Sequence, residues 1–238
     1  MRQAFVRALE EIALRREDLH LIVGDLGYGV VDRFRAHFPE RFLNVGVAEQ
    51  NMIGVAAGMA LAGKKVFVYS IANFPTLRCY EQIRNDVCFH RCDVTIVSVG
   101  AGFAYGPHGH THHGLEDVGA MRLLPDMKVL APCDPREVRA LTYGVAEAGG
   151  PAYLRLGRGG EPDVHVEELV PALGVIYKIR PGTDVALLGS GTVLPEVVSA
   201  SARLLADGIS AAVYSVPTLK PFDREAIVGL ASRFPCLV

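Results

Sequence analysis

The residue with the clearest capacity for chemistry is Glu49, an acidic side chain set among glycine and apolar residues. It stands in the run Asn44-Val-Gly-Val-Ala-Glu49-Gln-Asn-Met-Ile-Gly-Val-Ala-Ala-Gly58. Moving an ionised carboxylate from water into apolar packing is costly, so such a group finds a strong partner or takes up a proton. Either outcome suits proton transfer. The alternative is a structural role, in which Glu49 caps a helix that begins near Gln50. The pattern alone leaves these two interpretations equal.

A second group of residues consists of four histidines within a short glycine-rich segment: His108, His110, His112 and His113. Imidazole is a common zinc ligand, but a tetrahedral site needs ligands from more than one segment, and no thiolates stand at a suitable spacing. The run Cys88-Phe-His90-Arg-Cys92 also lacks a second ligand pair. The five cysteines are odd in number and scattered, as expected for reduced thiols in a cytosolic protein. The sequence therefore predicts no metal site in this chain.

Length and composition are consistent with a cytoplasmic enzyme subunit of one or two α/β domains. The chain has 238 residues, half of them hydrophobic, and a net charge of −2. This charge gives no general attraction to nucleic acid or to an anionic membrane, so we expect neither as a partner. The charged, amphipathic first residues argue against a signal peptide, and no stretch of about 18 apolar residues could span a bilayer.

Helical and strand patterns alternate along the chain, which is the sequence form of a parallel sheet covered by helices on both faces. Apolar spacing predicts helices over residues 3–16, 50–62, 77–89, 116–124 and 135–147. Buried strands are predicted at 19–25, 65–69, 93–99, 128–131 and 153–156. A loop rich in glycine and histidine spans 100–114. Together these elements predict a first domain over residues 1–160.

A linker with several prolines is predicted over residues 161–182, and the pattern restarts after it. Strands at 184–188 and 210–214 and helices at 194–205 and 223–232 predict a second domain over 183–238. A complete three-layer domain would need more strands than these, and a third only begins at Cys236, so we expect this domain to be truncated. The predicted fold class is α/β, with two three-layer α/β/α domains on mostly parallel sheets.

The run from Asn44 to Gly58 resembles the pyrimidine-domain signature of transketolase-type thiamine diphosphate enzymes. The runs Leu187-Leu-Gly-Ser-Gly-Thr and Tyr214-Ser-Val-Pro-Thr-Leu-Lys-Pro-Phe-Asp resemble their C-terminal domain. The resemblance implies that Glu49 hydrogen-bonds N1′ of the cofactor's aminopyrimidine and favours the tautomer that deprotonates the thiazolium carbon. A carboxyl group can share a proton with a ring nitrogen in a water-poor pocket, which a glutamine cannot do.

The same resemblance implies an aromatic platform for the aminopyrimidine. Phe74 matches the phenylalanine that stacks on this ring in the family. Ring stacking contributes about 0.5–1.5 kcal/mol beyond the buried area and fixes the plane of the ring. The neighbouring aromatic position of the family is Ile71 here, which narrows the platform but still excludes water. Without the family context, Phe74 would be interpreted as an ordinary core aromatic.

The resemblance also implies residues that contact the substrate. His112, the first histidine of a Thr-His-His run, matches the histidine that faces the substrate and is our candidate for proton transfer to a substrate oxygen. Arg158 matches an arginine of the family and suits a phosphate or carboxylate, and Arg2 is a second candidate. His108 stands where transketolases have an aspartate, and Gly100 where they have a phosphate-binding histidine. These departures favour an acceptor other than a standard pentose or hexose phosphate.

One half of such an enzyme is not matched by this sequence. In the family, a separate domain holds the cofactor's diphosphate and its magnesium through a Gly-Asp-Gly start and a downstream asparagine. Gly24-Asp25-Leu-Gly27 is the nearest approach, which makes Asp25 a candidate cofactor contact, but it lacks the partner asparagine at a plausible distance. We therefore expect the C-terminal subunit of a split transketolase. An N-terminal subunit would hold thiamine diphosphate and Mg²⁺ in an α2β2 heterotetramer.

The predicted reaction is the transfer of a two-carbon ketol unit between sugar-like small molecules. Alternatives within enzymes are a deoxyxylulose phosphate synthase-like carboligase and a β-type subunit of a 2-oxo acid dehydrogenase. The Glu-Gln-Asn-Met context favours transketolase, since the dehydrogenase type usually shows a different run after its glutamate. A non-catalytic interaction subunit is the remaining alternative, and the joint retention of Glu49, Phe74 and His112 argues against it.

Overall fold

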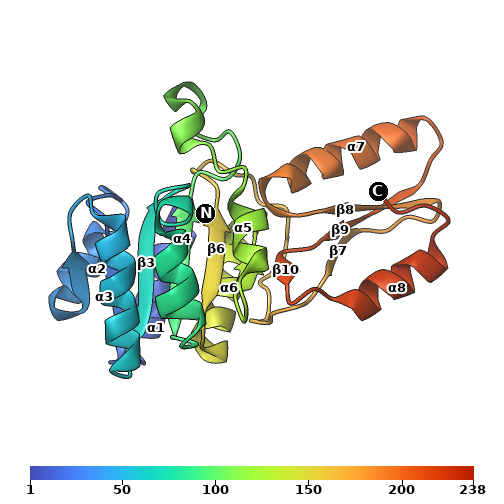
Figure 1. Cartoon of the computed structure of the whole chain (residues 1–238). Coiled ribbons are helices and arrows are strands. Elements are labelled where there is room, and N and C mark those ends of the chain that lie inside the picture. The colour runs from blue at the N-terminus through green and yellow to red at the C-terminus, as the bar shows by residue number, and fades with distance from the viewer.

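The computed structural model describes residues 1–238 and contains two β-sheets (Figure 1). The larger sheet has seven strands, in the order β10 (Thr218–Lys220), β5 (Lys128–Leu130), β6 (Ala152–Leu156), β4 (Val94–Val99), β3 (Lys65–Ile71), β1 (Leu19–Val23) and β2 (Phe42–Asn44). The smaller sheet has three, in the order β7 (Tyr177–Arg180), β9 (Ala211–Ser215) and β8 (Val185–Gly189). Only β10 and β7 run antiparallel to their neighbours. The predicted α/β class with mostly parallel sheets is confirmed.

Helices cover both faces of the larger sheet. One face carries α1 (Arg2–Ala13), α2 (Asp32–His37) and α6 (Pro135–Ala148). The other carries α3 (Glu49–Leu61), α4 (Tyr80–Gln82), the π-helical turn η3 (Ile83–Cys88) and α5 (Asp117–Leu123). Each layer buries its own hydrophobic cluster, and the alternation of side chains along each strand supplies both clusters. The first domain is therefore a three-layer sandwich.

The smaller sheet lies between two helices on opposite sides, α7 (Leu194–Ala206) and α8 (Arg224–Arg233), as Figure 1 shows. Apolar residues of α7, such as Leu194, pack on one face of this sheet. On the other face, Phe234, directly after α8, packs against Tyr214. Leu237 forms a single parallel bridge with Ala186, beside β8.

Four elements were not predicted from the sequence: α2, β2, β7 and β10. Strand β7 lies inside the predicted linker of residues 161–182, where Tyr177 and Ile179 alternate with charged residues. It pairs antiparallel with β9, with a register shift at Ile179. Strand β10 belongs by sequence to the second domain but pairs with β5 of the larger sheet. The stretch predicted as one helix over 77–89 consists of a 3₁₀ turn (Leu77–Cys79), α4 and η3. Short segments whose pairing partners are distant in sequence carry little periodic signal.

A cluster of polar groups joins the two sheets. The Glu137 carboxylate accepts a hydrogen bond from the Cys133 backbone N–H at 2.7 Å and contacts His165 Nε2 at 2.8 Å. These three side chains lie within 4.8 Å of one another. Asp134 caps α6 by accepting from the backbone N–H of Glu137 and also accepts from the backbone of His165. The segment after β6 is thereby fastened to the start of α6.

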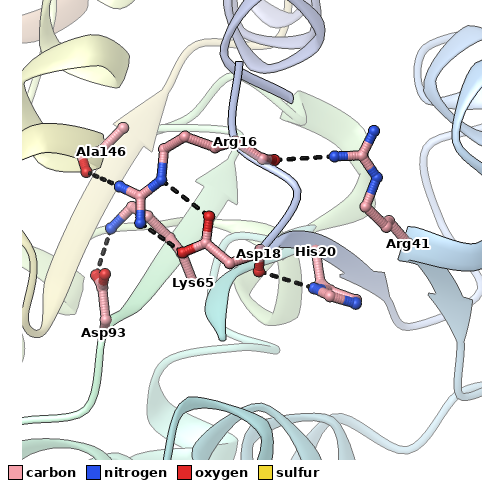
Figure 2. A network of polar contacts seen from close by, with 7 residues as sticks. All are labelled: Arg16, Asp18, His20, Arg41, Lys65, Asp93 and Ala146. Carbon is pink, nitrogen blue, oxygen red and sulfur yellow. Dashed lines mark hydrogen bonds and ion pairs between the residues drawn. The ribbon is translucent and has the colours of Figure 1, made fainter. Parts of the chain in front are cut away.

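A network at the amino ends of the strands fixes the opposite edge of the larger sheet (Figure 2). Lys65, at the start of β3, is buried and forms an ion pair with Asp93, just before β4. Burial lowers the pKa of Lys65, and the Asp93 carboxylate partly offsets this. Arg16 donates to the Asp18 carboxylate at 2.6 Å and to the Ala146 carbonyl at 2.7 Å. Ion pairs and hydrogen bonds thus hold the amino ends of these strands together. The loops at the carboxyl ends take no part in this network.

Every helix is too short or too polar to cross a membrane.

Candidate active site

The candidate site lies where the parallel strands of the larger sheet end. Strands β1, β3, β4 and β6 point their carboxyl ends toward one edge, because neighbouring pairs among them are parallel. The loops that follow these strands contain most of the predicted site residues. The loop after β4, residues 100–116, projects furthest from the sheet (Figure 1). Open α/β sheets generally place ligands at this edge.

Glu49 is the first residue of α3 and is 2% exposed. Its Oε2 accepts a hydrogen bond from Arg78 Nη1 at 2.7 Å. Its Oε1 is buried and has no hydrogen-bond partner. The start of α3 has no side-chain cap hydrogen bond, so the Glu49 side chain does not cap the helix, although Glu49 is the acidic residue of its first turn. The carboxyl instead combines one strong partner with one open, buried acceptor.

Arg78 connects Glu49 to the predicted aromatic platform. Its guanidinium carbon lies 4.4 Å from the centroid of the Phe74 ring, within cation–π range. Gln50, beside Glu49 on α3, donates from Nε2 to the Arg78 carbonyl at 3.0 Å. Phe74 is half-buried, and its backbone N–H donates to the carbonyl of Ile71, the last residue of β3. One arginine thus fixes the carboxylate relative to the phenyl ring.

His112 packs against the Phe74 ring. Its ring centroid is 5.1 Å from that of Phe74, with the ring planes at 69°. The Thr111 hydroxyl contacts His112 Nδ1 at 3.0 Å. Burial, the charge of His108 and the charge of His113 together lower the pKa of His112. The neutral imidazole is therefore favoured at neutral pH, and Nε2 is the nitrogen left for another partner.

The loop that carries the histidines is anchored at its base. Arg155, on β6, donates to the Gly114 carbonyl at 2.6 Å and to the Asp117 carboxylate at 2.8 Å. Asp117 is 1% exposed. Asn73 Nδ2 donates to the His113 carbonyl at 2.7 Å. The loop is thus held from two sides, which restricts where His112 can lie.

Two arginines lie at the far side of the histidine loop. The guanidinium carbon of Arg158 is 5.2 Å from the centroid of the Tyr105 ring. Arg2, the first residue of α1, lies beside the loop after β6, where a Cβ on Gly159 would be 3.4 Å from Arg2 Nη2. Arg2 is half-buried, whereas Arg158 is exposed. An anionic group near this loop would meet both positive charges.

The structure brings most of the predicted site residues together. Glu49, Phe74 and His112 form one chain of contacts through Arg78, and His108 extends it, with its ring 5.1 Å from that of His112. Ile71 is the last residue of β3, lies next to this group and is half-buried.

Asp25 lies after β1, and its carboxylate is already engaged. Its Oδ1 accepts from Tyr28 Oη at 2.7 Å and from Asn44 Nδ2 at 3.0 Å. The adjacent Gly24 lies against the Glu49 side chain, so Asp25 borders the site. A role of Asp25 in binding the cofactor stays a prediction, as do the roles of the other site residues.

Sequence reasoning missed Arg78 and Tyr105. A signal for Arg78 existed, because a buried Glu49 demands a cation and Arg78 stands in the same short run as Phe74. Tyr105 carried no such signal. Its importance depends on the folded position of its ring beside Gly100, Arg158 and His112.

Comparison with known proteins shows the family of this chain. The model of the transketolase pyrimidine-binding domain matches residues 1–161, and that of the transketolase C-terminal domain matches residues 174–238. A subunit of the apulose-4-phosphate transketolase of Actinobacillus succinogenes is 36% identical over 194 residues, which cover 82% of this chain and 62% of the relative. The 1-deoxy-D-xylulose-5-phosphate synthase of Pelotomaculum thermopropionicum is 34% identical over 235 residues, covering 97% of this chain and 36% of the relative.

A solved structure described as a split gene transketolase, an inactive beta4 tetramer, superimposes with a TM-score of 0.91 at 36% identity. The match covers 99% of this chain and 77% of that one. This chain spans less than two thirds of the apulose-4-phosphate transketolase subunit and about a third of the synthase. On the matched domains, the identities and the fold, the chain belongs to the transketolase family and corresponds to its pyrimidine-binding and C-terminal domains.

Proposed function

We propose that this chain binds the aminopyrimidine ring of thiamine diphosphate and, with a second subunit, transfers a two-carbon ketol unit between sugar-like substrates. The observation that supports this most is the Glu49 carboxyl, with Oε2 held by Arg78 and Oε1 buried without a partner. Leaving a buried acceptor unpaired costs about 1–3 kcal/mol. A ring nitrogen that shares a proton with Oε1 would remove this cost.

The surroundings of Oε1 fit a flat heterocycle. A Cβ on Gly24 would lie 3.8 Å from Oε1, so a larger side chain there would begin to cover this oxygen. Phe74 lies against the same Arg78 that holds the carboxyl and offers a surface for stacking. Thiamine diphosphate, when bound, supplies the thiazolium carbon that carries the transferred unit.

Within this proposal, each side chain has a defined task. Glu49 exchanges a proton with the ring nitrogen at Oε1. Arg78 restrains rotation of the carboxyl through the bond at Oε2. Phe74 fixes the plane of the ring, and Ile71 helps to exclude water.

His112 is the proposed proton donor and acceptor toward the substrate. Its lowered pKa leaves the imidazole neutral at pH 7, so it can take a proton from a substrate oxygen and return it. The contact between Thr111 Oγ1 and Nδ1 orients the ring and leaves Nε2 for this exchange. His108, whose ring packs against His112, is placed to contact a substrate hydroxyl.

The arginines suit an anionic end of the substrate. A guanidinium binds phosphate or carboxylate through paired N–H donors. Arg158 and Arg2 lie on the same side of the histidine loop, and the relative from Actinobacillus succinogenes is named for a phosphorylated sugar. We therefore propose a substrate with a phosphate-like group at this end.

We further propose a partner subunit that holds the cofactor's diphosphate and Mg²⁺. One similar protein is named as a single subunit of a transketolase and another as a split gene transketolase, and both names support a two-chain enzyme. Helix α3 includes Gly54 and Gly58, where a Cβ would meet no atom of this chain. Glycine inside a helix costs about 0.5–1 kcal/mol relative to alanine. Because no contact within this chain requires glycine at these two positions, we infer that they allow another chain to pack closely against α3. The assembly would be α2β2, with each site between chains.

The resemblance to a 1-deoxy-D-xylulose-5-phosphate synthase favours one second candidate, a carboligase that joins a two-carbon unit to a phosphorylated aldehyde. The two reactions differ in the donor. Ketose donors serve a transketolase, whereas a carboligase of this type uses a 2-oxo acid and releases CO₂. Release of CO₂ during turnover would therefore favour the second candidate.

The test is turnover by this chain mixed with the proposed diphosphate-binding subunit. Activity should require both chains and added thiamine diphosphate. Glu49→Gln should lower turnover by at least about 100-fold, the lower end of what general acid–base groups contribute. The matched control is Glu147→Gln, an exposed glutamate at the end of α6, which should leave turnover unchanged. Full activity of Glu49→Gln would reject the proposed role.

A further inference from the structure

Tyr105 lies at the centre of the histidine loop and is 9% exposed. Its ring centroid is 5.7 Å from that of His108 and 5.8 Å from that of His112, with both histidines tilted steeply to it. The Tyr105 carbonyl contacts His108 Nδ1 at 2.9 Å. The ring therefore packs against His112, which is proposed for proton transfer, and against His108, which is proposed to contact a substrate hydroxyl.

The Tyr105 ring occupies space that a side chain at position 100 would need. Gly100 has a φ of 99°, and a Cβ built on it would overlap the Tyr105 ring. Glycine tolerates both the backbone conformation and the close approach. Gly100 and Tyr105 are thus a matched pair, in which the phenol fills the space that the glycine leaves open.

The same ring supports Arg158. The guanidinium carbon lies 5.2 Å from the ring centroid, and this cation–π contact is the one interaction that the structure gives this exposed side chain. Burial raises the pKa of Tyr105, and the charges of Arg2 and Arg158 partly offset the rise. The phenol ring thus contacts both the Arg158 guanidinium and the two histidine rings.

We propose that Tyr105 is a positioning residue whose ring holds the Arg158 guanidinium at a set distance from His112. A substrate would fit when its anionic group and its reacting oxygen match this distance, so Tyr105 helps to select the substrate. This inference rests on the proposed function, in which Arg158 binds the anion and His112 faces the reacting end.

The first test measures the binding of inorganic phosphate to this chain. Binding is detected by NMR of the arginine side chains. Tyr105→Leu removes the ring and should weaken phosphate binding about fivefold, the effect of losing one partly exposed cation–π contact. Tyr105→Phe keeps the ring and should bind within about twofold of the wild type. Arg158→Gln is the reference variant for loss of the anion contact. Thermal unfolding of each variant checks that it is folded, and Tyr105→Met replaces the leucine variant if that one is not.

The outcomes distinguish failure of the proposed role of Tyr105 from failure of the proposed anion site at Arg158. Weaker binding in Tyr105→Leu with normal binding in Tyr105→Phe supports the proposal. Normal binding in Tyr105→Leu, with weak binding in Arg158→Gln, overturns the role of Tyr105 alone. Equal loss in the leucine and phenylalanine variants overturns positioning by the ring, because the hydroxyl would then be the active group. Normal binding in Arg158→Gln overturns the proposed anion site itself.

A second measurement uses the assembled enzyme with a sugar phosphate and with the same sugar lacking the phosphate. Tyr105→Leu should raise KM for the phosphorylated acceptor about fivefold more than it raises KM for the neutral sugar. A merely structural role would lower kcat for both acceptors. Equal effects on the two acceptors would therefore overturn the proposal.

Discussion

Replacing Arg78 by methionine removes the cation from the Glu49 carboxyl and keeps an apolar stem. Glu49 is 2% exposed and Arg78 46%. The pair thus lies between a surface ion pair, which contributes about 0.2–1 kcal/mol, and a fully buried pair, whose disruption costs about 3–5 kcal/mol. We expect Arg78→Met to lower the free energy of unfolding by about 2 kcal/mol, because both carboxylate oxygens then lack partners.

The assay is urea unfolding followed by far-UV circular dichroism, since the chain contains no tryptophan. In a Glu49→Leu background, Arg78→Met should cost only the contact with the Phe74 ring, about 0.5–1 kcal/mol. The two substitutions should therefore couple by about 1 kcal/mol or more. Arg84→Met, in the same segment but paired only with the neighbouring Asn85, is the matched control and should have little effect.

Additivity within about 0.5 kcal/mol would refute this reasoning, because it would mean that Arg78 and Glu49 do not interact in solution. A loss as large as about 4 kcal/mol in Arg78→Met alone would also contradict it, since that value belongs to a pair fully removed from water.

Three further predictions concern the histidine loop. Burial and the charge of His108 lower the pKa of His112, so its NMR titration midpoint should lie below 6.5 and should rise in His108→Asn; a wild-type midpoint at or above 6.5 would contradict this. Because the pKa of His112 is lower in the folded state, the unfolded state binds more protons below pH 6.5. The contribution of His112 should therefore reduce the free energy of unfolding as pH falls through 6.5. Arg155→Met should cost about 3 kcal/mol and speed amide exchange in the loop, and an equally protected loop would count against its anchoring role. Gly100→Ala should be destabilising by more than Gly102→Ala, whose added Cβ meets no atom, and equal losses in urea unfolding would show that the packed ring is unimportant.

Long periodic segments could be predicted from the sequence, because each buries a continuous apolar face. The strands β1, β3 and β4 and the helices α1 and α6 lie close to their predicted ranges. The missed strands β2, β7 and β10 have three or four residues each. Their pairing depends on partners far along the chain, as in β10 with β5, and local propensity cannot identify such partners.

Some residues of the site could be predicted from the sequence, and others could not. The cost of burying a carboxylate pointed to Glu49, and the family resemblance pointed to Phe74 and His112. The partner of Glu49 could not be deduced, because the turn between Phe74 and Tyr80 is 3₁₀ and α rather than one regular helix, and this turn sets the direction of Arg78. Tyr105 was missed because its packing on Gly100 exists only in the folded loop.

The proposed function depends on proton exchange between Glu49 Oε1 and the cofactor ring. The most direct measurement is the rate of hydrogen–deuterium exchange at the thiazolium carbon of thiamine diphosphate bound to the assembled enzyme. Glu49→Gln should slow this exchange by at least about 100-fold while the cofactor still binds. An exchange rate equal to that of the wild type, with the cofactor bound, would contradict the account.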